Sequence, residues 1–387
     1  MINYSKQSIS KRDIEEVNKV LKSDFLTQGP MVGKFENEIK KITKSKYAVA
    51  VNSATSGLHL ACMALGLKKN DWLWTSANSF VASSNCALLC QAKVDLLDIN
   101  LDDNNLDIEA LKRKLEIAKK KRRLPKILIP VHFAGKPCKM KEIHELSLKY
   151  KFHIIEDASH ALGSLLDKSR IGDCKYSSIC IFSFHPVKNI TTGEGGALTT
   201  NNKKIYEITK ILRTHGINKN KKLFINKKPP PWMFEQILLG LNYRMNDIEA
   251  ALGFSQLKRL KSFLIKRNMI AKFYKSAFDK TELILPKEDK RIFNAYHLYP
   301  IRLKKGNVKL RRLKLYELLK KKSINTNIHY IPIYRHPYYQ KLGFKVKNFP
   351  NCETYYNSTL SLPIYPDLKI KQLKKITKIV KDFLFNN

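Results

Sequence analysis

Several features that would assign a chain to a membrane, secreted or metal-binding class are missing from this sequence. Its seven cysteines form no C-x-x-C pair and mostly stand inside apolar runs, which predicts reduced core thiols in a cytoplasmic protein and no metal site. The most apolar stretch, residues 48–67, is interrupted by polar residues such as Asn52, Ser53 and His59, so it is unsuited to span a bilayer. The first residues, MINYSKQSISKRDIEEV, are polar and predict no signal peptide. We therefore expect no membrane partner.

Glycine-rich signatures of nucleotide binding are also missing. The chain has only 15 glycines, and none of them belongs to a G-x-x-x-x-G-K-[ST] P-loop. Gly193 and Gly195 stand close together, but Leu198 occupies the place where a dinucleotide fingerprint needs a further glycine. Phosphate binding by either motif is therefore disfavoured.

Acidic residues are scarce relative to basic ones. The 33 Asp and Glu against 72 Lys and Arg give a formal net charge of +39, which excludes an acidic solvating protein but would attract nucleic acid or another polyanion. The lysines recur along almost the whole chain, and no nucleic-acid module is recognisable. A generally lysine-rich composition is therefore favoured, and we expect no nucleic-acid partner; a basic nucleic-acid-binding protein is the alternative from another functional class.

What the sequence does contain is a repeated succession of short apolar runs and helical patterns. A helix is predicted from Ser10 to Leu21, and strands are predicted at residues 47–51, 94–99, 126–133, 152–157, 177–184 and 196–200. Continuous apolar strands that alternate with helices are typical of an α/β fold with a mostly parallel sheet covered on both faces.

A different pattern follows near residue 215. Residues 217–235 are basic, proline-rich and without periodicity, and a loop of this length is more often functional than idle. Further on, the pattern predicts helices at residues 247–264 and 309–322, strands at 282–286, 295–303 and 325–334, and an amphipathic helix that includes Leu373 and Phe383. The sequence therefore predicts a large domain of residues 1–255 and a smaller C-terminal α+β domain of residues 256–387.

Polar residues follow three of the predicted strands, at the sheet edge where open α/β folds bind their ligands. Thr55 and Ser56 lie in a turn before a helix whose N-terminus could hold a phosphate, although an ordinary N-cap turn explains the same residues. Asp157 could pair with a protonated pyridine nitrogen; a metal-ligating or capping acid is the alternative. Lys188 could act as a Schiff-base nucleophile if partial burial lowers its pKa, whereas most lysines in such a chain lie on the surface.

The order of phosphate turn, Asp157 and Lys188 resembles that of the fold-type I pyridoxal-phosphate enzymes. More narrowly, the chain is similar over essentially its whole length to the DegT/DnrJ/StrS-type nucleotide-sugar aminotransferases. The motifs that carry this resemblance are FLTQGPMVGKFE (25–36), EDASHALGS (156–164), FSFHPVKNITTGEGGAL (182–198), LRTHGI (212–217), LNYRMNDIEAALGFSQLKRL (241–260) and NIHYIPIY (327–334). Within the family, DASHALG, SFHPVK and NYRMND are most similar to the branch of pseudaminic acid biosynthesis.

The resemblance implies an aspartate-aminotransferase-like fold and a pyridoxal 5'-phosphate cofactor. It further implies amino transfer from glutamate to a UDP-linked 4-keto-6-deoxy-N-acetylhexosamine, which would give UDP-4-amino-4,6-dideoxy-N-acetyl-β-L-altrosamine. Another nucleotide-linked keto-sugar, aminated at C3 or C4, is the alternative, and so is a regulator that binds the cofactor without turnover. Relatives that dehydrate sugars carry a histidine in place of the lysine, so Lys188 favours transamination.

The resemblance also implies roles for single residues. Lys188 would bond to the cofactor and move the proton between cofactor and sugar, Asp157 would pair with the pyridine nitrogen, and His160 would lie beside the phenolic oxygen of the ring. Three hydroxyl side chains would hold the phosphate: Thr55, Ser56 and Ser183. Phe80 would stack on the ring unless it is a core phenylalanine, and Asn242 would reach the phosphate from the neighbouring subunit of a homodimer, so that the site is composite. Two side chains would contact the sugar nucleotide: Tyr243 and His329.

Overall fold

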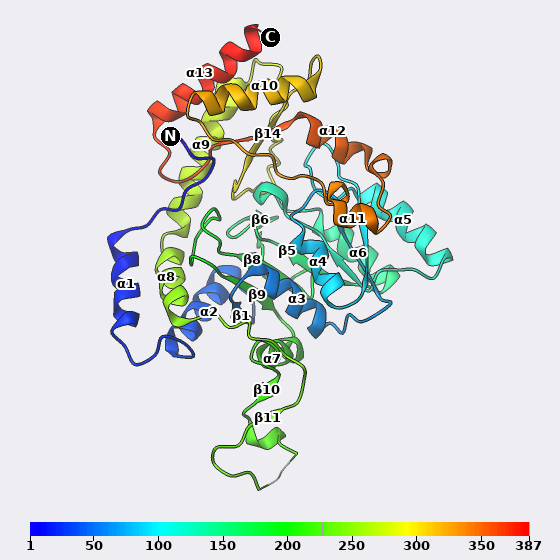
Figure 1. The fold of residues 1–387 in the computed structure, drawn as a ribbon, viewed down its shortest axis with the longest axis vertical. Helices are drawn as coiled ribbons and strands as arrows, with labels where there is room; N and C mark the ends of the chain where they lie inside the picture. The colour runs from blue at the N-terminus through cyan, green and yellow to red at the C-terminus, as the bar shows by residue number, and fades with distance from the viewer. Residues whose placement is uncertain (226–227, 387) are drawn as a thin grey trace.

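The computed structural model describes residues 1–225 and 228–386, and a seven-stranded sheet lies at its centre (Figure 1). The strand order is β1-β9-β8-β5-β4-β2-β3. The strands are β1 (Tyr47–Val51), β2 (Trp72–Ser76), β3 (Lys93–Leu97), β4 (Ile127–Ile129), β5 (His153–Asp157), β8 (Ile179–Ser183) and β9 (Gly196–Thr200). Only β9 runs antiparallel to its neighbours. The predicted α/β fold with a mostly parallel sheet is confirmed, although β2 was not among the predicted strands.

Each face of the sheet is covered by helices because successive strand side chains point to opposite faces. In β1, for example, Ala48 and Ala50 belong to one buried cluster and Val49 and Val51 to the other. The first cluster is completed by α2 (Pro30–Thr43), α5 (Ile108–Lys120), α6 (Met140–Tyr150) and α8 (Asp247–Leu257). The second is completed by α3 (Ala54–Ala64), α4 (Ala82–Leu89) and α7 (Lys203–Leu212).

The predicted N-terminal helix is confirmed as α1 (Lys11–Leu21). The Ser10 hydroxyl accepts the Asp13 amide hydrogen, and the Asp13 carboxylate accepts the Ser10 amide hydrogen, which satisfies two helix-end donors. The same buried Asp13 carboxylate accepts hydrogen bonds from Gln256 Nε2 at 2.8 Å and Arg259 Nη1 at 2.9 Å. The Asp13 side chain thus completes the N-terminal cap of α1 and also holds this helix against the end of α8.

A third buried cluster holds together the C-terminal part of the chain. It is enclosed by α9 (Leu260–Phe278), β13 (Tyr299–Arg302), α10 (Val308–Lys321), β14 (Thr359–Leu362) and α13 (Ile370–Asn386). Ile2, at the other end of the chain, is buried in the same cluster. The predicted boundary between residues 255 and 256 falls inside α8 and stays a prediction.

The segment between α10 and β14 packs on the second cluster instead. It contains η3 (Ile333–Arg335), α11 (Pro337–Lys341), η4 (Val346–Asn348) and α12 (Pro350–Ser358), and it contributes Ile333, Tyr334 and Tyr355 to that cluster. A small sheet of β6 (Leu165–Leu166), β7 (Ser169–Arg170) and β12 (Ile292–Phe293) and the turn η1 (Phe133–Gly135) complete this part of the fold.

Three predictions about C-terminal elements were wrong. The single helix expected over residues 247–264 is interrupted at Lys258 and Arg259, where α8 ends and α9 begins. The strand expected at 282–286 is reduced to one bridge between Ile284 and Arg302, since Pro286 has no amide hydrogen to donate to a ladder. The strand expected at 325–334 is mostly irregular, because its amides bind the large domain: Tyr330 N donates to Asn78 Oδ1 and Ile333 N to Ala77 O.

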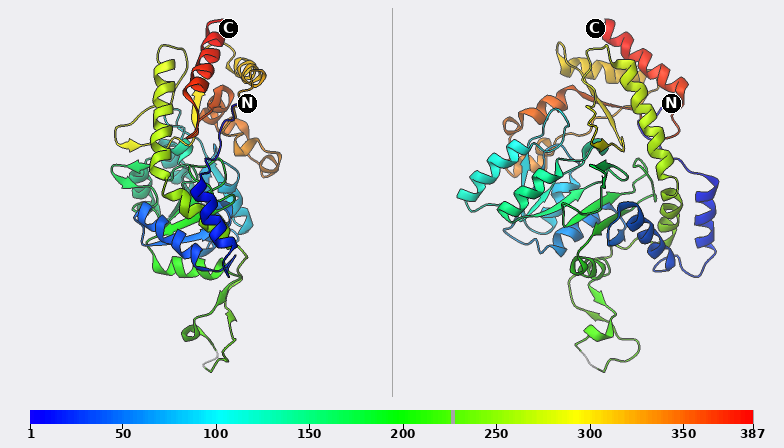
Figure 2. Two further views of the ribbon diagram at one scale, coloured as in Figure 1. Left: turned by 90° about the vertical axis from the view of Figure 1, so that its left-hand side faces the viewer. Right: turned by 180° about the vertical axis from the view of Figure 1, so that it is seen from behind.

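The basic, proline-rich loop projects from the body as an arm (Figures 1 and 2). The short strands β10 (Ile217–Asn218) and β11 (Glu235–Gln236) pair antiparallel at its base, and η2 (Lys221–Leu223) lies beyond them. Asn226 and Lys227, which belong to the predicted loop, lie outside the described residues. Over the described part of the chain, no helix has the length and apolar character needed to cross a membrane.

Candidate active site

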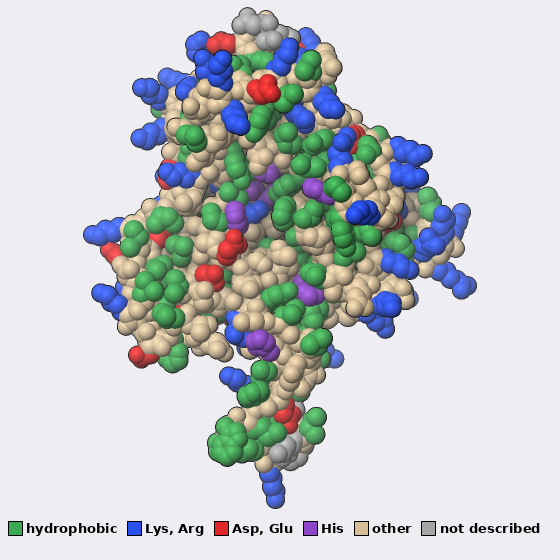
Figure 3. All heavy atoms as spheres, in the orientation of Figure 1, with side chains coloured by type: hydrophobic (Ala, Val, Ile, Leu, Met, Phe, Trp, Pro, Cys, Tyr) green, Lys and Arg blue, Asp and Glu red, His purple; other side chains and the backbone are tan. Residues whose placement is uncertain are grey.

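A cavity of about 520 Å³ lies at the carboxyl edge of the sheet. Seven of the side chains predicted from the sequence line it: Thr55, Phe80, Asp157, His160, Ser183, Lys188 and His329. Figure 3 shows histidine side chains gathered in a hollow near the centre of this face. Residues separated by up to 274 positions along the chain, from Thr55 to His329, therefore share one site.

The turn before α3 forms the end of the cavity that suits an anion. Ser53 caps α3 and accepts the Ser56 amide hydrogen, while Thr55 is exposed to the cavity. Gly196 allows this turn to pack against β9, because a Cβ at that position would lie 2.5 Å from the Ala54 nitrogen. The first amides of a helix have no intrahelical partner, so this end of the cavity offers donors for a phosphate.

Asp157 is held at the end of β5 by neutral donors. Its Oδ2 accepts a hydrogen bond from Ser83 Oγ at 2.6 Å, and its Oδ1 accepts one from the Ser159 amide at 3.1 Å. Ser83 in turn lies 2.8 Å from Ser79 Oγ, which lines the cavity. The sequence analysis missed Ser83, although it stands three residues after Phe80 in the same segment, SFVASS. The carboxylate is thus fixed in orientation, and it forms no ion pair within 4 Å among the described residues.

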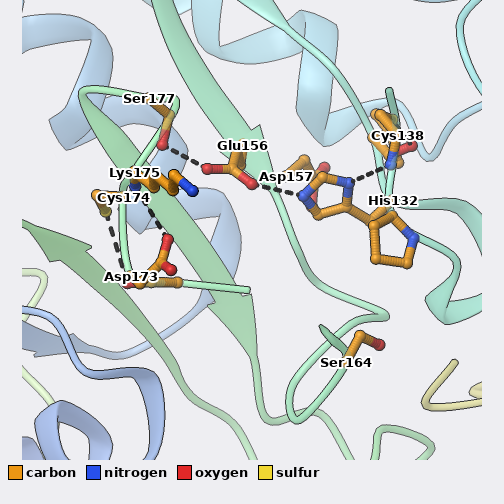
Figure 4. Close-up of polar contacts among 12 residues, drawn as sticks. His132, Cys138, Glu156, Asp157, Ser164, Asp173, Cys174, Lys175 and Ser177 are labelled. Carbon is orange, nitrogen blue, oxygen red and sulfur yellow. Dashed lines mark hydrogen bonds and ion pairs between the residues drawn. The ribbon is translucent and has the colours of Figure 1, made fainter. Parts of the chain in front are cut away.

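The neighbouring Glu156 points to the other face of the sheet and has a separate set of donors. Figure 4 shows it between Ser177 and His132, and His132 Nε2 lies 2.8 Å from its carboxylate. Since His132 Nδ1 accepts the Cys138 amide hydrogen, the proton of a neutral imidazole stands on Nε2 and is donated to Glu156. Two adjacent acids therefore lie in different environments, and only Asp157 faces the cavity.

Lys188 follows β8 in a turn in which its amide donates to His185 O at 2.9 Å. Burial of the ammonium lowers the pKa of Lys188 to about 8, and the nearby negative charge of Asp157 limits that shift. A lysine with an ordinary pKa near 10.4 is almost fully protonated at neutral pH. The lowered pKa leaves a substantial fraction as the free amine, which is the nucleophilic form.

His160 is a neutral donor in the wall of the cavity. Burial, together with Lys188 and His329, lowers the pKa of His160 well below its usual range. Its Nδ1 accepts the Ala134 amide hydrogen at 3.3 Å, so the ring proton stands on Nε2, which lies 2.8 Å from Tyr330 Oη. The site therefore presents a fixed imidazole N–H beside a protonated phenol.

Several lining residues were not among the predicted site residues, and His297, Tyr330 and Tyr4 are three of them. His297 packs on His160 with 4.3 Å between ring centroids, and burial lowers its pKa well below the usual range. Tyr330 and Tyr4 also line the cavity. His297 was read only as part of an expected strand, and Tyr4 precedes the first predicted helix. Tyr330 belongs to the motif NIHYIPIY, from which only the adjacent His329 was chosen as a site residue.

Three predicted site residues do not line the cavity of this chain. The Ser56 hydroxyl donates to Asn52 Oδ1 at 2.6 Å within the turn. Tyr243 Oη lies 3.2 Å from His59 Nδ1 on α3, and Tyr243 is absent from the cavity lining. Asn242 is exposed at the base of the arm, and its expected contribution to a partner's site stays a prediction.

Comparison with known proteins agrees with this geometry. The model of the DegT/DnrJ/EryC1/StrS aminotransferase family matches residues 7–381. The chain belongs to this family. It is 39% identical over 389 residues to the UDP-4-amino-4,6-dideoxy-N-acetyl-β-L-altrosamine transaminase of Campylobacter jejuni serotype O:2, covering 100% of this chain and 97% of the relative.

Solved structures of related proteins share the whole fold. PseC of Helicobacter pylori, described as an aminotransferase of pseudaminic acid biosynthesis, superposes with a TM-score of 0.90 at 30% identity, and the match covers 100% of both chains. A Streptococcus pneumoniae protein described as a sugar aminotransferase, in its PMP form, gives 0.91 at 27% identity and also covers 100% of both. The protein is accordingly an aminotransferase that depends on pyridoxal phosphate.

The residues present fit that cofactor. The cavity joins a lysine with a lowered pKa, a carboxylate held by neutral donors, an aromatic side chain and the N-terminus of α3. Phe80 is 58% exposed, so it is not the core phenylalanine that was considered as the alternative. The cavity thus offers a group of matching chemistry to each part of the cofactor: its aldehyde, its pyridine nitrogen, its ring face and its phosphate.

Proposed function

We propose that this enzyme transfers the amino group of glutamate to C4 of a UDP-linked 4-keto-6-deoxy-N-acetylhexosamine, which gives UDP-4-amino-4,6-dideoxy-N-acetyl-β-L-altrosamine. The observation that carries the transamination is the convergence of Lys188, Asp157 and His160 on one cavity. The sugar is supported by the 39% identity over the whole chain to a transaminase that carries this product in its name.

The residues of this chain have separate roles in the proposed reaction. When bound, the cofactor supplies an aldehyde that carries the amino group and a ring that withdraws electrons. Asp157 would keep the proton on the ring nitrogen, and His160, whose Nε2 lies 2.8 Å from Tyr330 Oη, would lie beside the phenolic oxygen. Lys188 Nζ accepts the proton from Cα of the amino donor and, in the second half of the cycle, delivers a proton to C4 of the sugar.

A panel of acceptors tests the substrate. Purified enzyme with glutamate is incubated with UDP- and dTDP-linked sugars that carry the ketone at C3 or at C4, and each product is identified by NMR. We expect the UDP-linked 4-keto-6-deoxy-N-acetylhexosamine to be aminated at C4 with the highest kcat/KM. A clear preference for a 3-keto or a dTDP-linked sugar would overturn the proposed substrate and leave the aminotransferase activity intact.

The arm supports a homodimer with composite active sites. Three of its side chains are largely exposed although apolar: Ile225 (86%), Trp232 (80%) and Phe234 (56%). A projecting hairpin with such a tip buries little surface within its own chain, and exposed apolar patches mark interaction sites. We propose that the arm packs on a second copy and that Asn242, at its base, reaches the phosphate site of that copy.

Charge at the tip of the arm should therefore disrupt both assembly and activity. We expect Trp232→Glu combined with Phe234→Glu to shift the protein from dimer to monomer in sedimentation velocity and to lower kcat/KM about 100-fold or more, because such apolar anchors carry a large share of interface energy. Ile117→Glu is the matched control, since Ile117 is 55% exposed on α5. A fully active dimer of the arm variant would contradict the proposed interface.

We also propose a cytoplasmic location. All seven cysteines are free thiols, and six of them are buried. Unpaired cysteines in this number are typical of proteins that remain in a reducing compartment.

A further inference from the structure

Residues 2–5, here called the strap, connect the C-terminal cluster with the turn that contains Lys188. Ile2 pairs with the end of α10 through hydrogen bonds from its amide to Ser323 O and from the Asn325 amide to its carbonyl, both 2.8 Å long. Tyr4 O accepts the Ile364 amide hydrogen at 3.0 Å, and Ser5 Oγ donates to Val187 O at 3.0 Å. Residues 2–5 are therefore fixed at both ends, next to the residue that precedes Lys188.

This strap places the Tyr4 side chain in the wall of the cavity. Tyr4 lines the cavity together with Asn327, His329 and Tyr330. Its ring lies 5.5 Å from the His329 ring at an angle of 53°, and Asn327 lines the cavity beside it. Burial raises the pKa of Tyr4 above its ordinary value, so the phenol stays protonated and can both donate and accept.

The groups on this side of the cavity are neutral. Burial, reinforced by Lys188, lowers the pKa of His329 to about 3, and Asn327 carries no charge. A carboxylate is bound best by a cation such as arginine, whereas neutral phenol, amide and imidazole groups match the hydroxyl and amide groups of a sugar. The wall formed by Tyr4, Asn327 and His329 thus has the chemistry of a carbohydrate subsite.

We propose that Tyr4 is a specificity-determining residue that hydrogen-bonds the sugar of the acceptor, with residues 2–5 forming one wall of the acceptor site. This inference rests on the proposed function, because it assigns Tyr4 to the sugar half of the cycle. A polar group built to hydrogen-bond a substrate discriminates strongly once it is buried by that substrate. The amino donor is recognised by its carboxylates and does not bind the Tyr4 hydroxyl.

The two half-reactions can be measured separately to test this assignment. Conversion of the holoenzyme by glutamate is followed by the loss of its visible absorption in single-turnover experiments, and the reverse change is followed after addition of the UDP-linked keto-sugar. For Tyr4→Phe we expect the sugar half-reaction to lose about 5-fold in kcat/KM, because one neutral hydrogen bond is lost, with the glutamate half-reaction changed less than 2-fold. Calorimetric affinity for the UDP-linked amino-sugar product should fall by a similar factor.

A comparison of Tyr4→Phe with one further variant separates this role from a structural one. Tyr4→Phe keeps the ring in the wall, and Tyr338→Phe is the matched control because Tyr338 is 60% exposed outside the cavity. Unchanged sugar rates in Tyr4→Phe, or equal losses in both half-reactions, would overturn the role of Tyr4 alone. Failure of the wild-type enzyme to convert any UDP-linked keto-sugar would overturn the proposed function and this inference with it.

Discussion

Replacement of Lys188 by alanine should lower kcat for transamination by about 10⁴-fold or more, because the proposed mechanism assigns both the covalent attachment and the proton transfer to this one group. The visible absorption band of the purified protein should disappear in the same variant. Lys203→Ala is the matched control, since the Lys203 side chain is 73% exposed on α7. A variant that keeps the band and more than a tenth of the activity would show that another amine holds the cofactor.

The pH dependence of cofactor capture provides an independent check on Lys188. Because the folded pKa lies near 8, below the ordinary value of 10.5, the fold favours the neutral amine. The rate at which the apoprotein bonds to pyridoxal phosphate should rise about tenfold per pH unit below pH 8, with the fraction of free amine, and level off above it. The lowered pKa of Lys188 also affects stability. Below pH 8 the lysine is an ammonium buried in the folded apoprotein, which lowers the free energy of unfolding. Lys188→Ala should therefore not destabilise the apoprotein at pH 7.

Asp157→Asn should give the second largest loss, about 10²-fold to 10⁴-fold in kcat/KM, because the amide removes the negative charge that keeps the ring nitrogen protonated. The substitution is nearly isosteric. The asparagine oxygen can still accept the hydrogen bond from Ser83 or from the Ser159 amide, so the fold should persist. The measurements are steady-state rates for both substrates and the pH at which the visible band changes.

Ser83→Ala separates the charge of Asp157 from its orientation. It removes the 2.6 Å hydrogen bond to Oδ2 and leaves the carboxylate in place. We expect a loss of about 10-fold, in line with one hydrogen bond to a charged group. Losses of equal size in Asp157→Asn and Ser83→Ala would show that position, and not charge, is the contribution of Asp157.

Particular residues show how much of the site the local sequence pattern could predict. Asp157 and Lys188 could be found because each follows a continuous apolar strand, and parallel strands bring their carboxyl ends to one edge. Thr55 could be found because a small polar turn precedes a helix. Ser56 was assigned to the phosphate on the same pattern, but its hydroxyl is engaged by Asn52, and the choice between the two hydroxyls depends on side-chain rotation that no spacing records.

The chain order of strands, turns and helices and the positions of Asp157 and Lys188 after strands were determined by the sequence itself, because periodicity and strand ends are local properties. Their expected roles came from the resemblance to the family. The tertiary structure alone decided that Tyr4, His297 and Tyr330 complete the cavity, that α8 and α9 are two helices, and that residues 325–334 bind the large domain instead of forming a strand. These features depend on contacts between segments up to three hundred residues apart, and such contacts are fixed only when the buried clusters form.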